Sequence, residues 1–179
     1  MSSAVSNEPK VTTTRPAGTP SARAEALAAR LEQGAAALEA FAATLTDAEW
    51  QMHVRPGGRK LGVMVHHVAW IYPLEMQLAL TVAAGKPVTG LVWDNIHELA
   101  AQHMTENDAV TKPQAFALLR QNSAAAAATI RTLSDEDLDR AAPVSLNDDA
   151  PLTCQFLLED HAVRHSYHHL ARIREAVKR

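Results

Sequence analysis

The sequence lacks most of the features that disulfide-linked, membrane-spanning or nucleic-acid-binding proteins need. It has a single cysteine, Cys154, which cannot form an internal disulfide and fits a reducing compartment. No apolar run is long enough to span a bilayer, and the first residues lack the apolar core of a signal peptide. The formal net charge is only -3, which gives no general attraction to phosphate backbones or anionic lipids. We therefore expect a cytoplasmic protein that binds neither nucleic acid nor membrane.

Aromatic residues are also scarce, at 4% of the chain, although 47% of the residues are hydrophobic. Much of this hydrophobic fraction is alanine and leucine rather than the β-branched and aromatic residues that strands favour, so helix is the expected secondary structure. The length of 179 residues fits one domain. Residues 1–20 mix Ser, Thr, Pro and charges without periodicity, which predicts a disordered tail before a single domain over 21–179.

Apolar residues recur with helical spacing in four long segments. The expected helices cover about 21–44, 61–84, 114–133 and 152–177. The second is apolar nearly all round, as expected for a central helix, and Pro73 predicts a kink in it. Residues 141–151 predict a loop. Short connections and no strand signal favour an all-α four-helix bundle, with a shorter helix at 92–108 in a crossover connection.

Histidine is concentrated in the last of these helices. His161, His165 and His169 are four residues apart and form one slowly turning stripe, with His168 beside them. Two imidazoles at this spacing can bind one metal ion, but a third ligand has to come from another segment. The alternative is that these histidines form a partly buried polar seam, or a solvated basic helix end.

A second histidine pair, His66 and His67, lies in the apolar second helix. Neighbouring residues point about 100° apart, so at most one of the two faces the inside of the bundle. His67 continues the apolar stripe slightly better than His66. Together with His165 and His169 it would offer three neutral ligands and leave a coordination position open for water or substrate, as in catalytic metal sites. The doubled pairs leave each ligand assignment open by one residue.

Other polar residues are candidates for supporting roles. His161, and His103 from the shorter helix, are candidates for moving a proton. The sequence also offers three groups that could orient a ligand ring, namely Glu159, Asp160 and Tyr167. It does not indicate which residues bind an organic cofactor.

Competing site chemistries fit less well. Segment 161–165 (HAVRH) lacks the glutamate that a zincin helix places after its first histidine, which disfavours a peptidase. The chain has no Glu-x-x-His pair, which disfavours a ferritin-like di-iron site. Cys154 could act as a nucleophile, but a lone cysteine is more often a small buried hydrophobic residue.

Several segments together resemble the DinB/YfiT-like superfamily of metalloenzymes. They are 58–69 (GRKLGVMVHHVA), 85–88 (GKPV), 93–94 (WD), 133–138 (LSDEDL) and 165–173 (HSYHHLARI). The resemblance covers nearly everything after the tail, and the paired histidines are its most specific part. It implies a four-helix bundle in which His67, His165 and His169 bind a divalent metal, commonly zinc or nickel.

The same resemblance suggests an activity. Family members with known functions include S-transferases and isomerases that use a low-molecular-weight thiol such as bacillithiol, mycothiol or glutathione. We therefore expect a metal-dependent enzyme acting on a small molecule, by thiol S-transfer or a related isomerising or hydrolytic reaction. The alternative is a non-catalytic metal-binding or stress-response protein, and an apolar bundle face would allow a homodimer.

Overall fold

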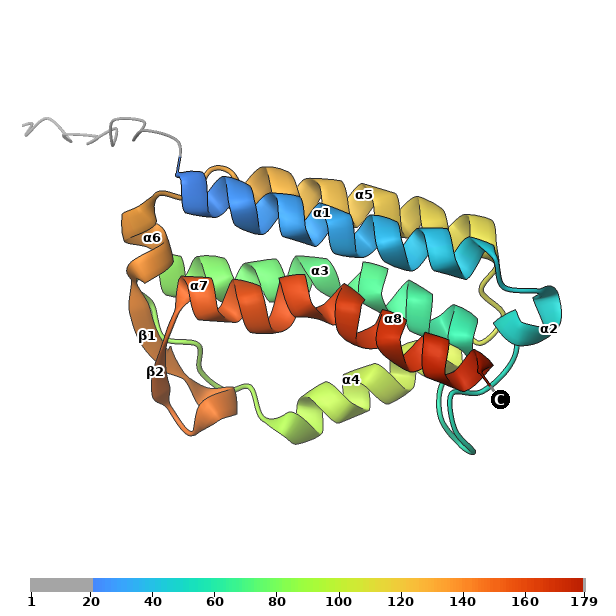
Figure 1. Ribbon diagram of the computed structural model, residues 1–179. Helices are drawn as coiled ribbons and strands as arrows, with labels where there is room; N and C mark the ends of the chain where they lie inside the picture. Colours follow the sequence, from blue (N-terminus) through green and yellow to red (C-terminus); the bar gives the residue numbers. More distant parts are fainter. Residues whose placement is uncertain (1–20, 179) are drawn as a thin grey trace, which may run out of the picture.

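Four long helical stretches lie side by side in the computed structural model, which describes residues 21–178 (Figure 1). The bundle consists of α1 (Ala22–Ala43), α3 (Leu61–Ala83), α5 (Lys112–Ile130) and a last stretch that ends in α8 (Arg164–Val177). Within the described residues, no helix is both long enough and apolar enough to cross a bilayer. The predicted four-helix bundle is confirmed. The expected tail over 1–20 lies outside the described residues, and the assignment of one domain stays a prediction.

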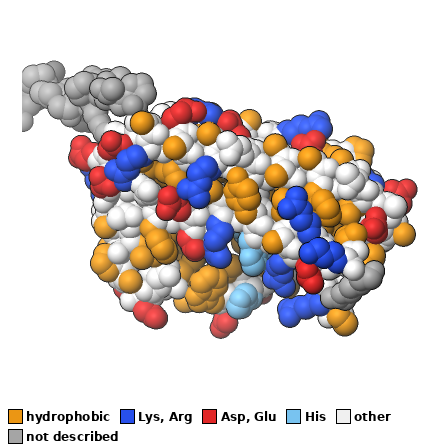
Figure 2. Space-filling view, in the orientation of Figure 1, with side chains coloured by type: hydrophobic (Ala, Val, Ile, Leu, Met, Phe, Trp, Pro, Cys, Tyr) orange, Lys and Arg blue, Asp and Glu red, His pale blue; other side chains and the backbone are white. Residues whose placement is uncertain are grey.

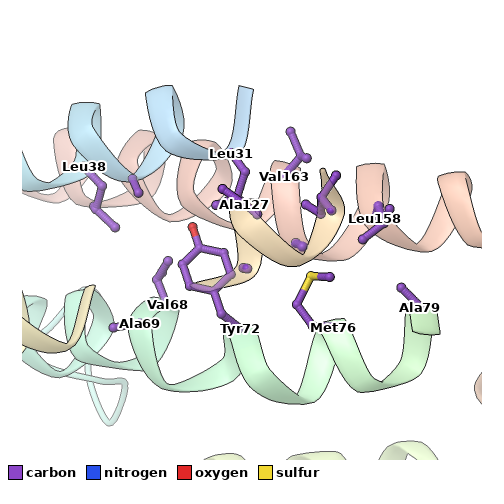
Figure 3. Packing of buried hydrophobic residues seen from close by; sticks show 14 of the residues in the cluster. Leu31, Leu38, Val68, Ala69, Tyr72, Met76, Ala79, Ala127, Leu158 and Val163 are labelled. Carbon is purple, nitrogen blue, oxygen red and sulfur yellow. The ribbon is translucent and has the colours of Figure 1, made fainter. Parts of the chain in front are cut away.

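The central helix is α3, which is buried on most of its circumference as its apolar sequence predicts. It continues through Pro73 without interruption from Leu61 to Ala83. Tyr72 is fully buried in the middle of the bundle, among residues such as Leu31 of α1 and Ala127 of α5 (Figure 3). Its hydroxyl and the Ser166 hydroxyl of α8 form a hydrogen bond of 2.5 Å, which satisfies both buried groups.

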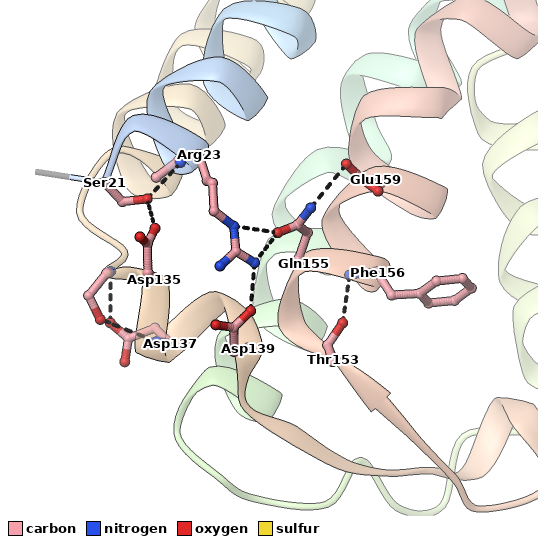
Figure 4. Close-up of polar contacts among 11 residues, drawn as sticks. Ser21, Arg23, Asp135, Asp137, Asp139, Thr153, Gln155, Phe156 and Glu159 are labelled. Carbon is pink, nitrogen blue, oxygen red and sulfur yellow. Dashed lines mark hydrogen bonds and ion pairs between the residues drawn. The ribbon is translucent and has the colours of Figure 1, made fainter.

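Polar contacts at one end of the bundle fix where α1 begins. The Ser21 hydroxyl accepts a hydrogen bond from the backbone of Ala24 and caps the helix. Arg23 forms an ion pair of 2.6 Å with Asp139 in α6 (Asp135–Asp139) and also donates to Gln155 near the start of the last helical stretch (Figure 4). These contacts join three segments that lie far apart in the sequence.

The prediction of a loop over 141–151 is wrong. Strand β1 (Ala141–Val144) pairs antiparallel with β2 (Ala150–Thr153), with Pro143 opposite Pro151. A 3-10 turn and two residues with positive φ, Asp148 and Asp149, close the hairpin. Each strand is only four residues long and contains a proline, so the sequence carries no strand periodicity.

The last helix is interrupted, in contrast to the prediction of one continuous helix over 152–177. It consists of α7 (Cys154–Leu157), a π-helical segment (Leu158–Val163) and α8. A π-helical turn takes up an extra residue, which rotates the preceding side chains by about 100° relative to the helix that follows. His161 lies in this segment, so it does not share a regular stripe with His165 and His169.

The predicted extra helix in the crossover is confirmed as α4 (Trp93–Glu106), which lies along the outside of the bundle and contacts α3 (Figure 1). Its start is attached by a hydrogen bond of 3.0 Å from the Trp93 indole to the backbone of Leu146. His103 is its one buried residue, and Ile96 is partly buried against the core. Most of α4 is therefore exposed to solvent.

We expect Gly62→Ala to lower the free energy of unfolding by about 1–3 kcal/mol, because the added methyl group overpacks the start of α3. A Cβ at this position would lie 2.3 Å from the indole of Trp50. That ring is buried, and its N–H donates to the backbone of Val110, so it cannot move aside easily.

Gly34→Ala is the matched control for chemical denaturation of both variants. Its closest neighbour is the ring edge of Tyr167 at 2.8 Å, and this side chain is 40% exposed and can rotate. The helix preference of alanine offsets part of the strain there. Equal losses of stability in the two variants would contradict the assignment of strain to Trp50.

Candidate metal centre

Three imidazoles meet between α3 and α8. His67 comes from α3, and His165 and His169 come from the same face of α8. Each ring offers a nitrogen, and these nitrogens all lie within 4.8 Å of one another. The ring centroid of His67 is 5.3 Å from that of His165 and 5.5 Å from that of His169. The structure thus brings together the three residues that the sequence suggested as ligands.

Each ring carries a buried nitrogen without a hydrogen-bond partner among the described residues. These atoms are Nδ1 of His67, Nε2 of His165 and Nδ1 of His169. A buried polar atom without a partner costs about 1–3 kcal/mol. Nδ1 of His103 and Oε2 of Glu75 also lack a partner among the described residues. Because one nitrogen of each cluster ring lies within 4.8 Å of those of the other two rings, a divalent transition metal could contact all three, and the donor set fits a metal of the zinc or nickel type.

The neighbouring histidines face elsewhere. His66 turns away from the three rings, and its Nδ1 lies 2.9 Å from Nε2 of His103. His168 is exposed, whereas His169 is buried. The geometry therefore selects His67 over His66 and His169 over His168, which the sequence could not decide.

The two proposed proton carriers differ in their position. His103 is buried beside Trp70, with ring centroids 4.5 Å apart, and its ring is 5.5 Å from that of His67. It therefore lies at the edge of the three-histidine cluster. His161 is partly buried in the π-helical segment, and its side chain forms no hydrogen bond, ion pair or ring contact with any residue in 21–178. The structure does not bring His161 into contact with the cluster.

A carboxylate that the sequence reasoning missed orients one of the rings. Glu75 of α3 is 5% exposed, and its Oε1 accepts a hydrogen bond of 2.6 Å from Nδ1–H of His165. This bond fixes the tautomer, so that Nε2 of His165 is free to bind a metal. Glu75 is the one acidic residue of α3. Its position in a mostly apolar helix was the feature of the sequence that could have pointed to this role.

The groups that the sequence suggested for this role are engaged elsewhere. Glu159 lies 3.5 Å from Arg30, and Asp160 pairs with Arg164 of its own helix at 3.1 Å. The hydroxyl of Tyr167 donates to the backbone of Arg30. None of these three side chains forms a hydrogen bond with a ligand ring in the described part of the chain, and Glu75 takes that role for His165.

Burial keeps His67, His169 and His103 neutral. Desolvation, with the positive charge of Arg59 as the next contribution, holds the pKa of His67 far below its usual value of 6.5. Desolvation, followed by the charges of neighbouring histidines, lowers the pKa of His169 to about 2. Desolvation also lowers the pKa of His103 to about 4. Neutral imidazole is the form that binds a metal ion, so His67 and His169 are in the binding form at neutral pH.

On the face of the molecule that Figure 2 shows, histidine side chains lie at the surface with Lys and Arg side chains beside them. A cavity of about 280 Å³ is lined in part by Met64, His97 and Arg172. Met64 and Arg172 lie one helical turn from His67 and His169, so this cavity is close to the cluster.

Comparisons with known proteins agree with this architecture. The sequence profile of the DinB superfamily matches residues 30–173. A solved structure, YfiT from Bacillus subtilis, superposes with a TM-score of 0.69 at 24% identity, covering 92% of this chain and 91% of that chain. YfiT is described as "a probable metal-dependent hydrolase with an unusual four-helix bundle topology". No curated protein matches the chain.

We expect Glu75→Gln to weaken the affinity for Zn²⁺ by about 10–100-fold, because the amide carries no charge to hold the N–H of His165. Competition with a chromophoric chelator measures this change. Glu159→Gln is the matched control, since it makes the same substitution on a carboxylate that contacts Arg30 and no ligand ring. Equal affinities in the two variants would exclude an orienting role for Glu75.

The stability of the metal-free protein should decrease with acid. Below pH 6.5 the unfolded chain protonates His67, His103 and His169, whereas burial keeps these rings neutral in the folded chain. The unfolded state therefore binds more protons, and the free energy of unfolding falls as pH drops from 6.5 to about 4. The slope is up to about 1.4 kcal/mol per pH unit for each histidine.

Urea denaturation at several pH values in the presence of a chelator measures this slope. His169→Ala removes one of the titrating groups and should make the slope smaller. A stability that does not change with pH in this window, or the same slope in both proteins, would contradict the assignment.

Proposed function

The chain belongs to the DinB superfamily, and from that premise we propose that it is a divalent-metal-dependent enzyme that activates a low-molecular-weight thiol for S-transfer or isomerisation. The observation that carries the proposal is the convergence of three imidazole rings between α3 and α8, with one nitrogen of each ring within 4.8 Å of those of the other two. No other group among the described residues offers this combination of metal-ligand chemistry and convergence.

His67, His165 and His169 would hold the metal. Three neutral ligands leave its positive charge uncompensated and a coordination position open, so a zinc or nickel ion there would lower the pKa of a thiol or water. Glu75 keeps the ring of His165 in the tautomer that binds a metal. We propose these roles for the four residues.

We propose that His103 moves the proton that the thiol loses. It is buried beside His67, and its ring is held by the hydrogen bond to His66. The lowered pKa of about 4 leaves this ring neutral and able to accept a proton at neutral pH. His66, the hydrogen-bond partner of His103, lines a cavity of about 610 Å³. A proton could pass from His103 through His66 to this cavity and so to solvent. That His161 also moves a proton stays a prediction.

Hydrolysis is the second candidate function. The similarity to YfiT, which is described as a probable metal-dependent hydrolase, favours it. The same ligands would then activate water in place of a thiol. A non-catalytic metal-binding protein, a cytoplasmic location and a homodimer stay predictions.

Elemental analysis of protein purified without a metal-affinity tag tests the metal site. We expect about one equivalent of a transition metal in the wild-type protein, and loss of most of it in His165→Ala, because two remaining imidazoles bind weakly. His97→Ala is the control, since this exposed histidine does not belong to the cluster. A metal content below about a tenth of an equivalent, unchanged in His165→Ala, would refute the proposal.

A substrate screen then separates the candidate activities. Epoxides and alkyl halides are tested with and without low-molecular-weight thiols, and esters and amides without them. Turnover that requires both the thiol and His165 supports S-transfer, whereas thiol-independent turnover of esters or amides supports hydrolysis. A metal-loaded protein without either activity would favour the non-catalytic alternative.

A further inference from the structure

Three arginines without an acidic partner line one cavity next to the histidine cluster. Arg55, Arg59 and Arg172 all line the cavity of about 280 Å³, and none of them forms an ion pair with any residue in 21–178. The other described arginines have partners within the chain. Arg174 lies over the ring of Phe41, and six others pair with carboxylates: Arg23, Arg30, Arg120, Arg131, Arg140 and Arg164.

The cavity has the composition of a site for an organic anion. No carboxylate is present among the described residues that line it. Besides the arginines, Val54, Met64 and Met104 contribute apolar walls. The larger cavity on the far side of His66 differs, because Glu106 lines it and no arginine or lysine does. The unpaired positive charge is therefore specific to the smaller cavity.

The cavity lies close to the three-histidine cluster on both helices that carry its rings. Arg172 follows His169 by one turn of α8, and Met64 precedes His67 by one turn of α3. On α4, Met104 is the neighbour of His103. The cavity and the cluster are therefore about one helical turn apart, which a small organic molecule can span.

Arg59 and Arg172 repel one another across the cavity. Burial, followed by the charge of Arg172, lowers the pKa of Arg59. A partly buried guanidinium without a counter-ion is unfavourable, and a divalent ion on the three histidines would increase the local positive charge. An anion between the two side chains would relieve both effects, since arginine binds carboxylates through paired N–H donors.

We propose that this cavity binds a carboxylate group of the small molecule that reacts at the three-histidine site, with Arg59 and Arg172 as its ligands and Arg55 at the rim. The substrate class is therefore a small organic acid, or a thiol that carries a carboxylate, with an apolar portion against Met64 and Met104. This inference rests on the proposed function for its reaction, but carboxylate binding can be measured without turnover.

The test is isothermal titration calorimetry with succinate, and with succinamide as the neutral probe of the same shape. We expect succinate to bind and succinamide not to bind. Arg59→Met and Arg172→Met should each weaken succinate binding at least about tenfold, because each removes a charge-assisted contact. Arg174→Met is the matched control, since it removes the same charge from the same helix outside the cavity.

His165→Ala separates this inference from the metal site. If succinate still binds to this variant and the binding depends on Arg172, the result supports the carboxylate site in the cavity, even if no metal is found. Binding that is lost in His165→Ala but unchanged in Arg59→Met and Arg172→Met would overturn it, because the carboxylate would then bind to the metal alone. Arginine-dependent binding of inorganic phosphate in place of succinate would overturn the assignment to a carboxylate.

Circular dichroism shows whether the Arg59→Met variant is still folded. Arg172 is exposed, so Arg172→Met should leave the fold intact and provides an independent measurement. Weaker binding only in a misfolded Arg59→Met, with wild-type affinity in Arg172→Met, would count against the proposal.

Discussion

Contacts between buried polar side chains determine how α3 and α8 pack against one another. Three imidazoles face one another there, and Tyr72 and Glu75 of α3 bond to Ser166 and His165 of α8. Apolar contacts tolerate small shifts between helices, whereas these hydrogen bonds are lost if either helix slides by one turn. The polar contacts therefore define the helix register, and the site is part of what specifies the fold.

Much of the fold and of the site could be predicted because the relevant patterns are local. The spacing of leucines predicts α1, and the four-residue spacing of His165 and His169 places both rings on one helix face. The sequence favours His67 over His66 only slightly, because both lie in a helix that is apolar on nearly all sides. Packing against α8 and α4 decides between them, by giving each of the two rings a different neighbour.

The features that were missed depend on contacts between distant segments. Glu75 and His165 are 90 positions apart, so no spacing rule connects them. The hairpin of β1 and β2 arises from pairing across a short turn, with prolines that argue against strands. The arginine cavity draws its walls from the segment before α3, from α3 itself, from α4 and from α8. Only the assembled bundle shows that Arg59 and Arg172 face the same space.

The small buried area of α4 has a consequence for how the site opens. His103 is the single buried residue of this helix, and its contacts are with His66, His67 and Trp70. Part of the free energy that holds α4 in place therefore comes from residues next to the three-histidine cluster, and the rest from Ile96 and from the hydrogen bond of Trp93 to Leu146. A helix attached in this way can unfold locally while the four-helix core stays folded. Local unfolding of α4 would expose the side chains that His103 contacts without any motion of the four-helix bundle.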